Sequence, residues 1–87
     1  MEFIYAGYGC YSATWNVTEK VKSRYQAGEH LIPATNEMAG GDPAPGYLKY
    51  LYVIWKANGG MYSAVCQERD ILPLPTAVAA PAPAARR

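Results

Sequence analysis

Residues 40–67, GGDPAPGYLKYLYVIWKANGGMYSAVCQ, are the segment around which this chain of 87 residues is organised. A loop rich in glycine and proline opens it, and two apolar runs follow that are joined by Asn58-Gly59. Asn-Gly between β-forming runs is a strong hairpin signal, because a type I′ turn requires positive φ at both central residues. The sequence therefore predicts a β-hairpin over residues 47–67.

A two-residue turn also predicts the register of the hairpin. The facing pairs would be Ala57 with Gly60, Trp55 with Tyr62, Val53 with Ala64, and Leu51 with Cys66. Because side chains alternate along a strand, the large members of these pairs share one face of the ribbon. The opposite face would carry Tyr50, Tyr52, Ile54, Lys56, Met61, Ser63, Val65 and Gln67. Both faces are substantially apolar, so we expect something to cover the second face as well.

The remaining segments predict further strands and one helix. Residues 2–8 resemble a first strand, followed by an extended piece that reaches Trp15. Asn16 is a suitable N-cap, with Glu19 in the first turn, for a helix over residues 17–26 that ends before Gly28. Residues 31–34 predict an edge strand because Pro33 cannot donate to a ladder, and residues 71–74 predict a closing strand.

Together these elements predict a mainly β fold, a small β-sandwich-like domain of about six strands with one short α-helix. We assign residues 1–74 to this single domain, with a stiff loop at residues 35–46. Residues 75–87, with the sequence PTAVAAPAPAARR, are poor in bulky apolar side chains, so we expect a flexible tail rich in proline and alanine.

The charges argue against some classes of partner. The formal net charge is +1, and two of the basic side chains are Arg86 and Arg87 at the C-terminus. Residues 1–74 carry six basic and seven acidic side chains with no basic stripe, so we do not expect nucleic acid as a partner. The N-terminal residues have no basic region followed by a long apolar run, so we expect a cytoplasmic protein without a membrane span.

Few residues in the sequence could carry chemistry. Cys10 and Cys66 are the only cysteines, and we expect two buried, reduced thiols. His30 is the only histidine, and no Cys-His pattern favours a nucleophile pair. Metal-ligating residues do not cluster along the chain, so we expect no metal and no cofactor.

Several segments of the chain resemble one known family. They are Ala6-Gly7-Tyr8-Gly9, residues 15–21 (WNVTEKV), residues 31–34 (LIPA), residues 41–46 (GDPAPG), residues 49–53 (KYLYV) and residues 71–73 (ILP). This pattern is similar to the C-terminal domain of J-proteins of the DnaJ homologue subfamily C member eleven type, over roughly residues 4–74. The resemblance implies a small β-rich domain and no reaction. His30 is followed by Leu31, so the His-Pro-Asp motif that stimulates a chaperone is missing.

The second hairpin face is the main candidate for function. Its predicted interface residues are Tyr50, Tyr52, Ile54, Met61 and Val65. The sequence leaves three uses open: internal packing against the helix and first strand, contact with another subunit, or a platform for a ligand. As a ligand platform, tyrosine rings would stack on a sugar while Asn36, Asp42 and Tyr47 form a ligand loop.

We favour a non-enzymatic binding module that self-associates into a homo-oligomer through this aromatic face. A carbohydrate-binding, lectin-like module is the first alternative, so a glycan or protein ligand stays open. A small enzyme is the second alternative, although no catalytic pattern favours it.

Overall fold

The structure is a computed structural model, and it describes residues 1–75. Within these residues the chain forms six strands and two helices, so the prediction of a mainly β fold is confirmed. The elements are β1 (Glu2–Cys10), β2 (Ala13–Asn16), α1 (Thr18–Gln26), β3 (Leu31–Pro33), α2 (Asn36–Ala39), β4 (Tyr50–Ala57), β5 (Gly60–Gln67) and β6 (Ile71–Pro73).

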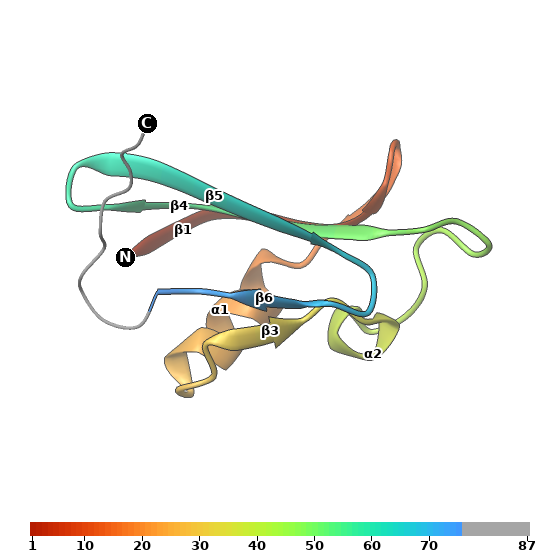
Figure 1. The fold of residues 1–87 in the computed structure, drawn as a ribbon, viewed down its shortest axis with the longest axis horizontal. Coiled ribbons are helices and arrows are strands. Elements are labelled where there is room, and N and C mark those ends of the chain that lie inside the picture. The colour runs from red at the N-terminus through yellow and green to blue at the C-terminus, as the bar shows by residue number, and fades with distance from the viewer. Residues whose placement is uncertain (76–87) are drawn as a thin grey trace.

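The strands form two antiparallel sheets that lie in two layers. The large sheet has the order β2-β1-β4-β5, and β3 and β6 pair as a separate small sheet. Figure 1 shows that the small sheet and both helices lie on the same side of the large sheet. The large sheet therefore has an inner face, which is covered, and an outer face on which no described element packs.

The β4–β5 hairpin has the predicted register. Ala57 pairs with Gly60, and Trp55 pairs with Tyr62, whose ring stacks on the indole at 6.0 Å between centroids. Asn58 and Gly59 have φ angles of 51° and 80°, as a type I′ turn requires. The strands are shorter than predicted at one end, because residues 47–49 belong to the preceding loop and β4 begins at Tyr50.

Helix α1 lies where the sequence predicted it, but it begins differently. Val17 is the N-cap residue and makes no side-chain cap, so the predicted Asn16–Glu19 capping pair is wrong. The Asn16 Oδ1 instead accepts a hydrogen bond of 2.9 Å from the Thr18 N–H. At the other end Gly28, with φ of 97°, closes a Schellman motif, in which the Glu29 N–H donates to the Arg24 carbonyl at 2.9 Å.

A second helix, α2, lies within the segment predicted to be a loop. The Thr35 Oγ1 accepts a hydrogen bond of 3.1 Å from the Met38 N–H, and Gly40 ends the turn with φ of 87°. Four residues are too few for a hydrophobic periodicity, so only the Thr cap and the glycine could have indicated this helix. Met38 and Ala39 are buried, and this anchoring explains why the single turn persists.

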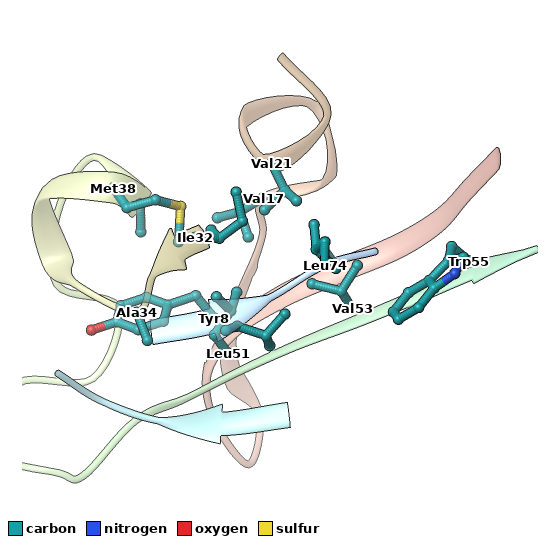
Figure 2. Close-up of a cluster of buried hydrophobic side chains, with 13 residues drawn as sticks. Tyr8, Val17, Val21, Ile32, Ala34, Met38, Leu51, Val53, Trp55 and Leu74 are labelled. Carbon is teal, nitrogen blue, oxygen red and sulfur yellow. The ribbon is translucent and has the colours of Figure 1, made fainter. Parts of the chain in front are cut away.

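The core fills the space between the large sheet and the elements on its inner face (Figure 2). From the large sheet come Ala6, Tyr8, Leu51, Val53 and Trp55. From the covering elements and loops come Val17, Val21, Ile32, Ala34, Met38, Ala39, Leu72 and Leu74. Helix α1, which contacts β1, therefore lies on the same side of the sheet as Leu51, Val53 and Trp55 and leaves the face of Tyr50 and Tyr52 uncovered (Figure 1).

The predicted boundary between the domain and its tail falls close to the end of the described residues. Pro75, the first residue assigned to the tail, accepts a hydrogen bond of 2.7 Å from the Tyr25 hydroxyl through its carbonyl oxygen. The rest of the predicted tail, residues 76–87, lies outside the described residues.

We predict that Trp55→Ala lowers the free energy of unfolding by about 3–5 kcal/mol, because it opens a cavity in the core and removes the stack on Tyr62. Trp55 is only 6% exposed. Urea unfolding monitored by circular dichroism measures the loss. The control is Lys56→Ala at the neighbouring, exposed position, which should change stability by less than about 0.5 kcal/mol. Equal midpoints for both variants would contradict the buried position of the indole.

Candidate functional site

The outer face of the large sheet carries all five predicted interface residues. Tyr50, Met61 and Val65 are 40%, 61% and 64% exposed, while Tyr52 and Ile54 are half-buried. They come from two paired strands, with Tyr52 opposite Val65 and Tyr50 opposite Gln67. The alternation of side chains along β4 and β5 brings these residues to one surface, as the sequence predicted, while α1 and the small sheet lie on the other face (Figure 1).

Strand β1 extends this surface through a tyrosine lying over a glycine. Gly7 pairs with Tyr52, and the rings of Tyr5 and Tyr52 lie 6.4 Å apart between centroids. A Cβ atom at Gly7 would approach atoms of both rings to within 2.8–2.9 Å. Glycine at this position therefore lets the two rings lie low against the sheet, which explains why Tyr52 is half-buried although no element covers it.

One end of the outer face is hollowed into a groove of about 540 Å³. It is lined by Gly9, Cys10, Tyr11, Tyr47, Leu48, Tyr50, Tyr52 and Val65. Tyr11, at the tip of the β1–β2 turn, is 95% exposed and has φ of 46°. Tyr11 and Leu48 were not predicted as site residues, because only the folded chain brings the turn and the residues before β4 together.

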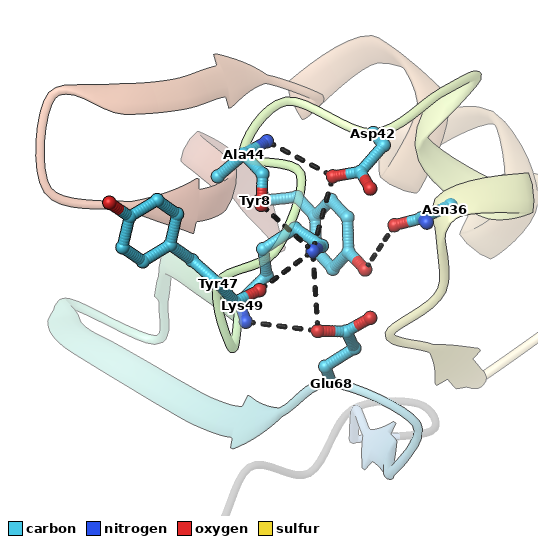
Figure 3. A network of polar contacts seen from close by, with 7 residues as sticks. All are labelled: Tyr8, Asn36, Asp42, Ala44, Tyr47, Lys49 and Glu68. Carbon is cyan, nitrogen blue, oxygen red and sulfur yellow. Dashed lines mark hydrogen bonds and ion pairs between the residues drawn. The ribbon is translucent and has the colours of Figure 1, made fainter.

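The predicted ligand loop is divided between two places. Asn36 and Asp42 belong to a polar cluster on the inner side, whereas the ring of Tyr47 points away from that cluster and lines the groove (Figure 3). The Asn36 Oδ1 accepts a hydrogen bond of 2.9 Å from the Tyr8 hydroxyl. The Asp42 Oδ1 lies 3.1 Å from the Lys49 Nζ and also accepts from the Ala44 N–H. These oxygens are therefore engaged within the protein.

Lys49 is the centre of this polar cluster, and its side chain is buried. The Lys49 Nζ donates to the carbonyl oxygens of Tyr47 at 2.8 Å and Ala44 at 3.2 Å. Its charge is balanced by Asp42 and by Glu68, whose Oε1 lies 3.4 Å away. The ammonium thus ties the Asp42–Tyr47 loop to the end of the hairpin, a structural role that leaves no donor for a ligand.

Opposing effects act on the pKa of Lys49. Desolvation by burial lowers the pKa, but the hydrogen bond and charge of Asp42, together with Glu68, outweigh it and raise the pKa above its ordinary value. The Tyr8 hydroxyl is also affected, because burial and the charge of Glu68 raise its pKa. Lys49 therefore stays charged and Tyr8 neutral at physiological pH.

The residues considered for chemistry lie in ordinary surroundings. The imidazole of His30 packs on the ring of Tyr25 at 4.5 Å between centroids. Cys10 and Cys66 are free thiols, but both are half-buried, so the prediction that they are buried is wrong. Cys66 sits on the edge strand β5, where only one neighbouring strand shields it. No group of His, Cys, Asp or Glu suited to a metal ion occurs among residues 1–75.

Within the described part of the chain, neither helix is long and apolar enough to cross a membrane. Comparison with known proteins finds no matching family model, no similar curated protein and no similar solved structure. Nothing in these comparisons links the chain to the J-protein domain, so that resemblance stays a prediction from the sequence.

We predict that the free energy of unfolding falls as the pH rises above about 10, the ordinary pKa of tyrosine. The pKa values of Tyr8 and Lys49 are raised in the folded state, so on raising the pH the unfolded chain loses these protons first. The stabilisation that the two protonated groups provide is therefore complete below the pKa of the unfolded chain and is lost as the pH rises through the pKa of the folded state. Tyr8→Phe should lose about 1 kcal/mol at pH 7 and decline less steeply above pH 10. Urea unfolding at pH values from 8 to 11 measures the free energy of unfolding of the wild type and of the variant. If the two free energies fell in parallel above about pH 10, this would contradict a raised pKa of Tyr8.

The two thiols should differ in reactivity. Burial and the charge of Asp70 raise the pKa of Cys66, so its reactive thiolate is scarcer at neutral pH. We expect a maleimide to label Cys10 faster than Cys66 in native protein, as followed by mass spectrometry of Cys10→Ser and Cys66→Ser variants. Equal rates in urea are the control. Faster labelling of native Cys66 would show that the edge of β5 is open to the reagent.

Proposed function

We propose that this protein is a non-enzymatic assembly module that self-associates through the outer face of its large sheet. One observation carries the proposal: no described element covers this face, although it presents Tyr50, Met61 and Val65 at 40–64% exposure. Contiguous apolar surface on a small protein is commonly a contact site. Burying it removes apolar area from water, which is the main driving force of association.

A second copy of the chain is the partner best matched to this face. The charged residues of this face are Glu2 and Lys56, which have opposite signs and face each other near one end of β1 and β4, so a twofold contact would bring few like charges together. The five interface residues offer roughly 400–600 Å², which is less than the roughly 800 Å² per partner of a standard interface. Tyr11, Tyr47 and Leu48, which line the groove beside them, extend the apolar surface toward that size.

We predict that Tyr52→Glu dissociates the assembly, because a carboxylate at the centre of a desolvated contact has no partner. Sedimentation velocity at high micromolar concentration should change from an oligomer to a smaller species, while circular dichroism stays unchanged. Since Tyr52 packs on Tyr5, Tyr50→Glu at an exposed position on the same strand provides a second variant.

Leu31→Glu is the matched control for this experiment. Leu31 is 60% exposed but belongs to the small sheet, away from the outer face. This variant should keep the wild-type sedimentation coefficient. A wild-type protein that sediments as a monomer at high micromolar concentration would overturn the proposal.

Carbohydrate binding is the second candidate, and the groove favours it. Exposed tyrosine rings, those of Tyr11, Tyr47 and Tyr50, surround an open hollow into which an apolar sugar face could stack. Asn36 and Asp42 are engaged elsewhere, so hydroxyl partners would have to come from tyrosine hydroxyls and main-chain groups around the groove. Titration of a glycan panel, with Tyr47→Ala as the variant, tests this function; saturable binding that the variant abolishes would support it.

A further inference from the structure

Strand β5 forms a long edge of the large sheet that no described residue pairs with. It pairs with β4 on one side, and its eight residues are all half-buried or exposed. In contrast, alternate residues of β4 are fully buried. Beyond β5 the chain turns away at residues 68–70 and enters the small sheet in the other layer (Figure 1).

The hairpin register shows which main-chain groups point outward from this edge. The type I′ turn makes Ala57 and Gly60 a hydrogen-bonded pair, and such pairs alternate along the ladder. Lys49 and Glu68 lie eight positions, an even number, from Ala57 and Gly60, so they should also form a hydrogen-bonded pair. The bond of 2.7 Å from the Glu68 N–H to the Lys49 carbonyl supports this assignment. The N–H and C=O groups of Met61, Ser63 and Val65 therefore point away from β4.

The sequence of β5 lacks the features with which proteins protect such an edge. GMYSAVCQ contains no proline, no charged side chain and no bulge in its pairing with β4. The other edges differ, since β2 has four residues and both strands of the small sheet have three residues and end in proline. An edge that is long, uncharged and regular is a template for another strand.

We propose that β5 pairs with β5 of a second copy, antiparallel and about a twofold axis at Ser63. In this register Ser63 faces Ser63 of the partner subunit, while Met61 faces Val65 of the partner subunit. All the outward main-chain groups of these three residues then find hydrogen-bonding partners. A twofold edge contact closes on itself, so it produces a dimer with a continuous sheet and does not produce a fibre.

A second copy fits this edge for two further reasons. The absence of charge on β5 removes repulsion between identical strands. The side chains of Tyr62, Ala64 and Cys66 are half-buried at the border of the core. In this register Tyr62 would face Ala64 of the partner subunit, and Cys66 would face Gly60 of the partner subunit. The edge contact does not require that the outer face binds anything, so the two surfaces are independent and together would give a dimer of dimers.

Two variants distinguish the contact along the β5 edge from the contact through the outer face of the large sheet. Ser63→Pro removes an outward N–H without touching the ladder to β4, and Ser63→Ala, which keeps that N–H, is its matched control. In sedimentation velocity, Ser63→Pro should have half the mass of Ser63→Ala. Tyr52→Glu, which disrupts the contact between outer faces, should have half the mass of the wild type. The double variant should be monomeric. If Ser63→Pro has the mass of Ser63→Ala while Tyr52→Glu dissociates, the edge proposal fails and the proposed function stands.

Cross-linking tests the register without relying on a proline. In a Cys10→Ser, Cys66→Ser background, Ser63→Cys should form an intermolecular disulfide, because facing Cα atoms of a hydrogen-bonded pair lie about 5.5 Å apart. Met61→Cys in the same background is the control, since it would face Val65 of the partner subunit and should not cross-link to itself. No disulfide at residue 63 under mild oxidation, or equal yields at 61 and 63, would overturn the proposed pairing.

Discussion

The rest of the fold is built on the register of the β4–β5 hairpin. Asn58 and Gly59 adopt positive φ, and this two-residue turn sets which residues of the two strands face each other. A slip of one residue would move Leu51, Val53 and Trp55 from the core to the outer face. The same turn therefore determines the core and the aromatic surface at once.

The described residues cover the large sheet on only one side (Figure 1). The inner face receives α1, α2 and the small sheet, which bury Val17, Val21, Ile32 and Leu72 against it. After these elements the described chain has no segment left for the other side. A small domain buries a modest fraction of its surface, so an uncovered apolar face favours association with another molecule.

Lys49 shows how a charged side chain helps to position the groove from the opposite side. Its ammonium holds the carbonyl oxygens of Ala44 and Tyr47, and this fixes the loop that directs the Tyr47 ring outward (Figure 3). The cluster satisfies the buried charge with two carboxylates and two carbonyl groups, as a buried lysine requires. The groove and the proposed contact surface thus rest on an internal polar network.

Local sequence alone predicts the hairpin, its register, the position of α1 and the residues that share each face of the hairpin, because turn chemistry and the strand period of two act locally. It could not determine which face α1 would cover, since both faces of the hairpin are apolar and only packing chooses between them. It also missed α2, the buried ion cluster of Lys49 and the place of Tyr11 beside Tyr47. For α2 the only local signals are the Thr35 cap and Gly40, whereas the other two features depend on contacts between segments distant in the chain, such as Lys49 with Glu68, which no local pattern encodes.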